Sequence, residues 1–189
     1  MAVVLSFGFY KNDLREDMPR VVAFVDMGHC ALQVVLESFN KERLKMLATT
    51  IDGVKGRDFN MVLVRYFIQE FKKRYKLDLA ANWSARMLRI TECERLKKRM
   101  SANSHDLPLN IEWFKNDGDV AGKMKWETFE AMSTELLARA ERSMAWALKV
   151  AGLRPTDVES VELVGGGVLV PAVKQLVRKV LQREPLTTL

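Results

Sequence analysis

The stretch from Val21 to Leu36, VVAFVDMGHCALQVVL, constrains the fold of this chain more than any other part of it. Two apolar runs flank the break at Met27–His29, which predicts a strand, a tight turn and an antiparallel partner strand. Gly28 is expected to supply the positive φ that such a turn needs. Asp26 stands at the end of the first strand, so the strand delivers its carboxylate to the turn.

A second glycine turn is expected near the other end of the chain. A strand-like run at 161–164 leads into Gly165, Gly166 and Gly167. An amphipathic helix is predicted over 171–181, with proline at its first position. Glycines between a strand and a helix let the backbone approach a phosphate closely, but they serve equally well in a tight turn without a ligand. The triplet alone does not decide between these two interpretations.

The residues between the two turns read as an insertion of helices and strands that builds a wall beside them. The predicted helices cover residues 58–76, 81–102 and 126–151. The predicted strands cover residues 44–50, 109–114 and 120–124. Asp58 is a candidate N-cap for the first helix, and Gly152 is expected to end the last one. Together these elements indicate an α/β fold.

Length and charge narrow the class of partner. A chain of 189 residues with 48% hydrophobic residues can bury one large domain or two small subdomains. The net charge of +6 is scattered, and the densest basic clusters, 72–74 and 95–99, lie in helical patterns that also carry acidic residues. We therefore expect solvated helix faces and no nucleic-acid partner. No apolar run is long enough to span a bilayer, so no membrane partner is expected.

The cysteines and histidines form no recognisable metal or disulfide pattern. Cys30 and Cys93 stand alone, which favours a reducing, cytoplasmic setting. His29 and His105 do not complete a metal site with them, and no metal ligand is assigned. The apolar run at 2–9 lacks a basic leader and a cleavage site, so we expect an element cut from a longer chain rather than a signal peptide.

One face of the predicted helix at 81–102 is polar. It carries Glu94, Lys97, Lys98 and Ser101, spaced at i, i+3, i+4 and i+7. A carboxylate beside two ammonium groups can hydrogen-bond ribose hydroxyls and line an adenine. The alternative is an exposed face with a local ion pair, and the spacing alone favours that alternative.

Other candidate residues are weaker. Asp26 at a strand end suits a hydrated Mg²⁺ ion, or it simply caps its own turn. His29 is a candidate phosphate contact, although a lone histidine in a turn is more often exposed to solvent. The chain has no P-loop, no HExxH motif and no Ser/His/Asp arrangement, so the residues by themselves support no catalytic assignment.

Four motifs in this order resemble the ATPase domain of the seventy-kilodalton heat-shock chaperones. They are VDMGH at 25–29, ECERLKKRMSAN at 92–103, DLPLNIE at 106–112 and LVGGGVLVPAV at 163–173. VDMGH, and MSAN with DLPL, resemble more specifically the large, 110-kilodalton class of that family. The resemblance runs over almost the whole chain but covers only the second lobe of the family's actin-like fold.

The resemblance implies an actin-like ATPase lobe, a mixed sheet with flanking helices, that carries an inserted helical subdomain. Residues 1–52 and 127–189 would form the sheet-bearing subdomain, and residues 56–125 the inserted helical subdomain. The implied cofactor is ATP or ADP with Mg²⁺. The implied partners are other heat-shock chaperones and, if the chain is a fragment, the first lobe of its own ATPase domain.

The resemblance also assigns nucleotide-binding residues in three groups. Asp26, Gly28 and His29 match the turn that faces the β- and γ-phosphates. The helix that lines adenosine is matched by Glu94, Lys97, Lys98 and Ser101. Gly165 and Gly166 match the turn under the nucleotide, with Gly167 in place of a small residue that often bears a hydroxyl.

Departures from the family pattern point to weak binding. Residues 28–31 read GHCA where the family has a glycine triplet and a threonine, so the turn offers fewer free N–H donors. Leu169 stands where the ATPases carry an arginine that stacks on adenine, a contribution of about 0.5–2 kcal/mol. The loop at 55–56 is shorter than the family's double-glycine turn.

The family's catalytic lysine lies in the first lobe, so hydrolysis by this chain alone is not expected. The resulting prediction is a lobe of a co-chaperone of the nucleotide-exchange class that binds ATP or ADP weakly. The alternative is a protein-interaction module with a vestigial nucleotide site.

Overall fold

The computed structural model describes residues 19–40, 43–75, 83–102, 107–115 and 118–187. The chain divides into two compact units. The sheet unit consists of the described residues up to Gly56 and from Leu137 onward, and the helical unit runs from Arg57 to Leu136. The predicted element at 2–9 and His105 lie outside the described residues.

The sheet unit contains a five-stranded mixed sheet in the order β3-β2-β1-β6-β7. Its strands are β1 (Arg20–Met27), β2 (Leu32–Phe39), β3 (Leu44–Asp52), β6 (Ser160–Val164) and β7 (Leu186–Thr187). The β1–β2 and β2–β3 pairs are antiparallel, whereas β6 runs parallel to both β1 and β7. The predicted hairpin and third strand are confirmed.

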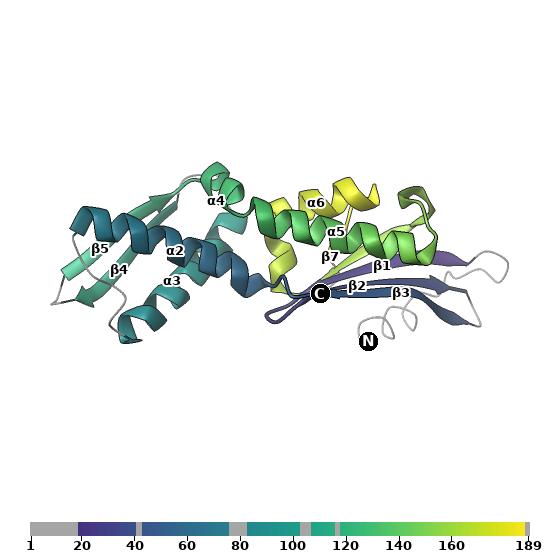
Figure 1. Cartoon of the computed structure of the whole chain (residues 1–189), viewed down its shortest axis with the longest axis horizontal. Coiled ribbons are helices and arrows are strands. Elements are labelled where there is room, and N and C mark those ends of the chain that lie inside the picture. Colours follow the sequence, from purple (N-terminus) through teal and green to yellow (C-terminus); the bar gives the residue numbers. More distant parts are fainter. Residues whose placement is uncertain (1–18, 41–42, 76–82, 103–106, 116–117, 188–189) are drawn as a thin grey trace. The chain divides into compact units, whose positions relative to one another are not determined.

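Two helices, α5 (Thr134–Ala151) and α6 (Pro171–Leu181), lie together on one face of this sheet (Figure 1). The residues of α5 that are buried recur at helical spacing: Ala140, Ser143, Met144, Ala147 and Leu148. Thr50 Oγ1 lies 3.2 Å from Ser143 Oγ, which joins β3 to α5. Helix α6 begins at Pro171 as predicted, because proline tolerates the first helical position.

The opposite face of the sheet combines a hydrophobic cluster with two carboxylates. The cluster consists of Val22, Phe24, Val35 and Phe39. Glu37 lies opposite Val22 and Glu162 lies opposite Phe24, so both side chains share this face. Glu37 is 0% exposed, and neither of its carboxylate oxygens has a hydrogen-bond partner in the described part of the chain. Burial raises the pKa of the Glu37 carboxyl.

In the residues that the structure describes, the helical unit contains three helices and a hairpin. These are α2 (Gly56–Tyr75), α3 (Trp83–Ala102), β4 (Leu107–Lys115), β5 (Gly118–Met124) and α4 (Trp126–Met132). The buried phenylalanines Phe59, Phe67 and Phe71 follow one face of α2, as the periodicity predicts. Gly122 lets β5 pack on that face, because a Cβ there would lie 2.6 Å from the Phe67 ring.

Two predicted helix boundaries are wrong. The helix expected over 126–151 is interrupted at Ser133, whose hydroxyl donates to the Phe129 carbonyl at 2.8 Å. A serine that bonds back to the i−4 carbonyl competes with the regular helical pattern, and hydrophobic periodicity does not register it. Asp58 is not the N-cap of α2, because the helix already begins at Gly56. The expected end at Gly152 is confirmed by its φ of +68°.

The mixed sheet with helices on it confirms the predicted α/β class. The assignment of residues 56–125 as a subdomain inserted into an ATPase lobe stays a prediction. Within the ranges that the structure describes, no helix has both the length and the apolar character needed to cross a membrane.

Candidate functional site

The first turn, Gly28–Ala31, joins β1 to β2 and is closed by a backbone hydrogen bond. The Gly28 N–H donates to the Ala31 carbonyl at 3.2 Å. Gly28 does not adopt a left-handed φ, and a Cβ built on it would make an ordinary 3.7 Å contact with Asp26 Oδ1. The prediction that this turn needs glycine for its φ is therefore wrong.

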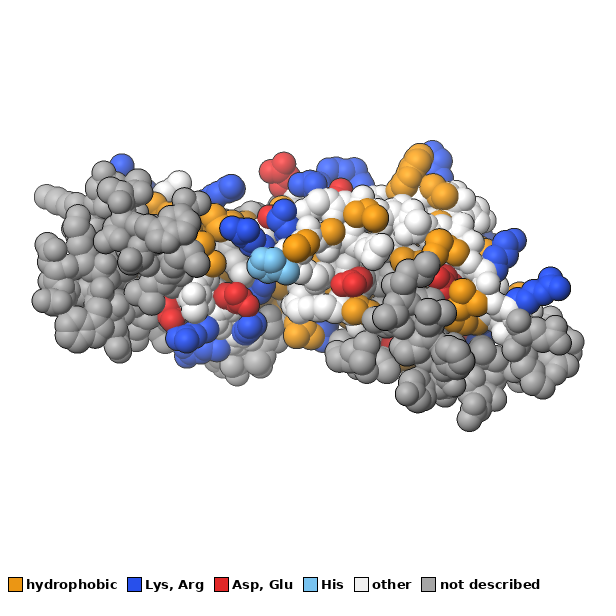
Figure 2. Space-filling model, turned by 90° about the horizontal axis from the view of Figure 1, so that it is seen from below, with side chains coloured by type: hydrophobic (Ala, Val, Ile, Leu, Met, Phe, Trp, Pro, Cys, Tyr) orange, Lys and Arg blue, Asp and Glu red, His pale blue; other side chains and the backbone are white. Residues whose placement is uncertain are grey.

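The tip of this turn is open to solvent. His29 and Cys30 are both exposed, and the histidine side chain is visible at the surface in Figure 2. Their N–H groups donate to no backbone carbonyl among the described residues, which leaves two donors at the tip. The described part of the chain contains no group of three or more histidine, cysteine or acidic side chains suited to a metal ion.

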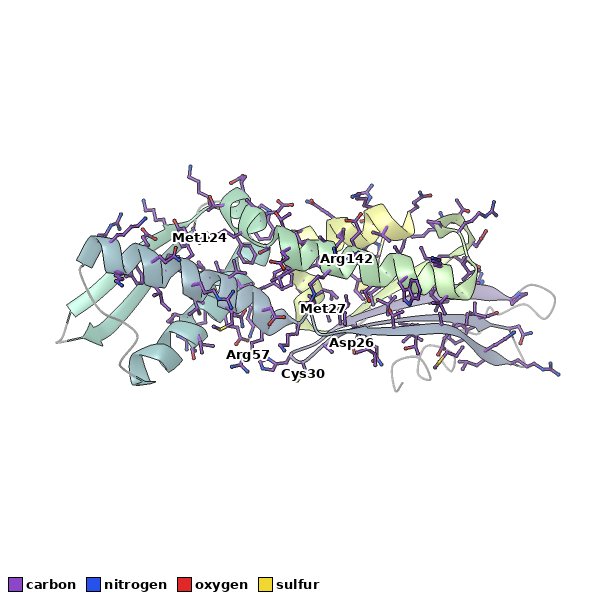
Figure 3. All side chains as sticks on the ribbon, in the orientation of Figure 1. Asp26, Met27, Cys30, Arg57, Met124 and Arg142 are labelled. Carbon is purple, nitrogen blue, oxygen red and sulfur yellow. The ribbon has the colours of Figure 1, made fainter. Side chains whose placement is uncertain are left out.

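Asp26 lies between the two glycine turns. It is paired with Gln33 on β2 and with Val164 on β6, near the end of β1 (Figure 3). Its Oδ1 lies 2.9 Å from where a Cβ on Gly165 would stand. Burial raises the pKa of the Asp26 carboxyl, since desolvation disfavours its charged form.

The second turn joins β6 to a short 3₁₀ helix, η2 (Gly166–Leu169), and packs on the end of β1. Gly165 has a φ of +85°, and a Cβ on it would lie 2.7 Å from the Met27 carbonyl oxygen. A Cβ on Gly167 would lie 2.6 Å from Met27 Cγ. Gly166 is different: it is exposed, and no atom of the described residues lies within 4 Å of a Cβ built there.

The loop that ends at Gly56 also contacts both glycine turns. The Gly56 N–H donates to the Gly28 carbonyl at 3.0 Å, and a Cβ on Gly56 would lie 3.4 Å from Gly167 Cα. We call Gly28, Gly56, Gly165, Gly166 and Gly167 the glycine cluster. In the sequence, Gly56 stands out only as part of a shortened loop. The one sign of its role in the sequence is its place between a loop and the start of a helix, and hydrophobic periodicity carries no information about such a glycine.

The loop that carries Gly56 is held by a charged anchor. Asp52 Oδ1 accepts hydrogen bonds from the Val54 N–H and from Arg139 Nη2, both at 2.8 Å. Arg139 belongs to α5, so this helix positions the loop beside the glycine cluster.

The candidate residues on α3 differ in exposure. Lys98 Nζ lies 2.9 Å from Glu94 Oε1, and both side chains are accessible to solvent. Lys97 is only 7% exposed, and burial lowers the pKa of its ammonium group while the charge of Glu94 opposes that shift. Ser101 lies one turn further along α3. The solvated-face alternative fits Lys98 but not Lys97, which is buried although it is charged.

The sheet unit therefore brings together Asp26 and the glycines of both predicted turns, at the end of a mixed sheet covered by helices. This is the architecture of an actin-like ATPase lobe. The chain belongs to the Hsp70 family: the family model described as "Hsp70 protein" matches residues 1–189.

Three relatives illustrate the match. The chain is 47% identical to human heat shock 70 kDa protein 4L, 48% identical to human heat shock 70 kDa protein 4, and 44% identical to the 97 kDa heat shock protein of Strongylocentrotus purpuratus. Each alignment covers 100% of this chain but only 22–23% of the relative. The four-motif resemblance, including that to the large class, is confirmed. The chain spans less than a quarter of the length of these relatives.

Proposed function

We propose that this chain is a nucleotide-binding lobe of an Hsp70-family ATPase domain, which binds ATP or ADP with Mg²⁺ weakly and does not hydrolyse ATP by itself. The observation that carries this proposal is the space at Gly166. Its neighbours Gly165 and Gly167 are forced to be glycine by packing, but nothing in the described fold fills the place of a side chain at Gly166. An exposed backbone without a side chain suits the close approach of a phosphate or sugar.

The phosphate side of the proposed site is the β1–β2 turn. The exposed N–H groups of His29 and Cys30 are donors suited to an anion. Asp26 would hold a hydrated Mg²⁺ through water, and a partly buried carboxylate gains from a nearby cation. When bound, the metal ion supplies positive charge that neutralises phosphate oxygens.

The remaining assignments follow the family resemblance. Gly165, Gly166 and Gly167 would lie under the nucleotide. The adenosine side would be formed by Glu94, Lys97, Lys98 and Ser101. The burial of Lys97 supports a role beyond that of a solvated surface charge.

Two observations support weak binding. The Gly28 N–H already donates to Ala31, so it is not available to a phosphate unless the turn opens. Leu169, at the position where the resemblance expects an adenine-stacking arginine, is 48% exposed and offers no cation.

The test is isothermal titration of ADP and of ATP with Mg²⁺ into the wild type and two variants. Lys97→Ala should abolish binding, and Leu169→Arg should tighten it by about twofold to thirtyfold, because stacking adds roughly 0.5–2 kcal/mol. Leu169 is exposed, so its replacement leaves the core intact and the test does not depend on the stability of Lys97→Ala. Binding unchanged in both variants would contradict the adenosine assignment.

A second candidate function is a protein-interaction module with a vestigial nucleotide site. The occupied Gly28 N–H and the exposed Leu169 favour it. It replaces the first proposal if no variant shows heat or a melting shift at millimolar nucleotide.

In either case we propose other heat-shock chaperones as partners, with a nucleotide-exchange role, in the cytoplasm. Exposed Cys30 and buried Cys93 are not joined in a disulfide, which suits such a reducing compartment. The exchange role is tested by whether the chain accelerates ADP release from a seventy-kilodalton chaperone. An unchanged release rate would contradict it.

A further inference from the structure

The outward side of α5 carries two exposed apolar side chains in register. Trp146 is 55% exposed, and Val150, one turn later, is 53% exposed. Residues four apart lie next to each other on a helix, so the two form one apolar strip. Tryptophan is a large apolar side chain that is usually mostly buried, and its exposure on a well-packed helix calls for an explanation.

Two cationic side chains of α5 flank this strip. Arg142, one turn before Trp146, is exposed on α5 (Figure 3), and Lys149 Nζ lies 5.2 Å from the centroid of the Trp146 ring. Residues 142–150 read RSMAWALKV and contain no acidic residue. The adjacent carboxylate, Glu141, is already paired with Lys179 of α6 at 2.9 Å. We call Arg142, Trp146, Lys149 and Val150 the Trp146 strip.

The strip is not needed to hold α5 in place. The opposite side of the helix supplies the buried contacts, including Met144 and Leu148, and Ser143 is bonded to Thr50 of β3. The helix therefore presents Trp146 from a rigid scaffold. A rigid aromatic anchor beside an arginine is the composition found at the energetic centre of protein interfaces.

We propose that the Trp146 strip binds an acidic amphipathic helix of a partner protein. Apolar side chains of the partner cover Trp146 and Val150, while its carboxylates meet Arg142 and Lys149. Charge decides the occupant. A second copy of this chain brings a net charge of +6 and the same basic helix, so like charges repel. A nucleic acid would use the cations but leave the apolar strip uncovered.

The test uses the whole 189-residue chain and a synthetic fluorescein-labelled peptide of about 18 residues, five helical turns. The peptide carries leucines at i, i+3, i+4 and i+7 spacing with glutamates between them. Fluorescence anisotropy should show saturable binding that weakens with added salt. Trp146→Ala and Lys149→Glu should each weaken binding by about tenfold. Trp146→Phe, which keeps an aromatic ring, should retain most of it.

Matched controls separate the strip from charge alone. Lys72→Glu on α2 makes the same charge change as Lys149→Glu and should leave the peptide affinity within about twofold of wild type. A scrambled peptide of identical composition should bind at least about tenfold more weakly, since it lacks an apolar face.

Several outcomes overturn the proposal. One is equal affinity of Trp146→Ala and wild type for the peptide, and another is equal binding of the scrambled peptide. A third is Trp146-dependent binding of phosphatidylserine vesicles or duplex DNA without binding of the peptide, which would identify a membrane or nucleic acid as the occupant. Trp146-dependent dimerisation in sedimentation experiments, again without peptide binding, would identify a second copy.

Discussion

The two turns of the sheet unit each begin with a glycine after an apolar strand, but these glycines meet different steric constraints. In the turn after β6, Gly165 has a left-handed φ of +85°. A side chain at position 167 would place its Cβ against Met27. In the turn after β1, Gly28 has neither a left-handed φ nor a crowded Cβ position. Packing requires glycine at Gly165 and Gly167, whereas it does not require glycine at Gly28 or Gly166.

Only some of these glycines are therefore evidence for a bound ligand. A glycine that packing demands is explained by the fold alone, so its presence says nothing about a bound molecule. A glycine that packing leaves open is the better candidate for ligand contact. Stability and nucleotide affinity should therefore respond to different glycines of the same cluster.

The largest effect is expected for Gly165→Ala, which should lower the free energy of unfolding by about 3 kcal/mol or more. The alanine would combine left-handed strain with a 2.7 Å approach to the Met27 carbonyl oxygen. Urea unfolding followed by circular dichroism measures the loss.

The matched control for Gly165→Ala is Gly152→Ala. Gly152 has a similar φ of +68°, but within the described part of the chain nothing lies within 4 Å of a Cβ there. The Gly152→Ala substitution should lower the free energy of unfolding by only about 1 kcal/mol, the contribution of backbone strain alone. Equal losses in the two variants would show that the Met27 contact relaxes freely, and the contrast between the turns would disappear.

Asp26→Asn should weaken Mg²⁺-dependent ADP binding by about tenfold or more while leaving the chain folded, because the amide cannot balance a cation. The pKa of Asp26 is raised by burial, so the folded state binds its proton more tightly than the unfolded state. The protonated Asp26 carboxyl therefore adds to the free energy of unfolding at low pH. This contribution is lost as the pH rises above the ordinary pKa of 3.8 and through the raised pKa. The variant should therefore be at least as stable as wild type at neutral pH.

The effect of Glu37 on the pH dependence of stability must be separated from that of Asp26, because burial also raises the pKa of Glu37. Urea unfolding between about pH 4 and 8 in a Glu37→Gln background isolates the Asp26 contribution. There, Asp26→Asn should flatten the remaining fall of stability with rising pH. An unchanged slope would show that Asp26 is ordinarily solvated and is not held between the two turns.

Gly166→Ala should leave the free energy of unfolding within about 0.5 kcal/mol of wild type, since the space beside it is open. It should nevertheless reduce ADP affinity by about threefold to tenfold, because the added methyl group occupies the proposed approach of the ligand. Calorimetric titration and unfolding on the same samples test both statements. A stable variant with unchanged ADP affinity would show that the open space at Gly166 is not where the nucleotide approaches, and would contradict the main support for the proposed function.

The smallest effect is expected for Gly28→Ala. Its Cβ would make an ordinary 3.7 Å contact, so stability should change by no more than about 0.5 kcal/mol. ADP affinity should also change by less than about twofold, because the Gly28 N–H donates to Ala31 instead of to a ligand. A large loss of affinity without a loss of stability would indicate that this turn opens when nucleotide binds.

Local patterns predicted the elements but not their interruptions. The β1–β2 hairpin, the strand at 160–164 and helix α6 follow from residue alternation, apolar runs and a proline at a helix start. At the break, the Ser133 hydroxyl donates to the Phe129 carbonyl, which also accepts the Ser133 N–H, and these local bonds leave the hydrophobic pattern unchanged. A long helix was therefore predicted where two helices are found.

The candidate site was predicted only in part for the same kind of reason. Asp26 and the Gly165–Gly167 turn stand out in the sequence because each follows an apolar strand. Gly56 was missed as a contact because it gains its role from Gly28 and Gly167, which are remote in sequence. The burial of Lys97 was also not predicted, since the helical spacing of charges looks the same on solvated and covered faces.

Most of the strands and helices, the family and the places where glycine interrupts an apolar run could be predicted from the sequence, because these depend on neighbouring residues and on motifs. Only the tertiary structure decided which glycines are obligatory. That distinction arises from the backbone of β1 meeting the turn after β6, with Met27 pressed against Gly165 and Gly167 and open space beside Gly166. Steric exclusion of this kind acts between atoms that the chain brings together only when the sheet has formed.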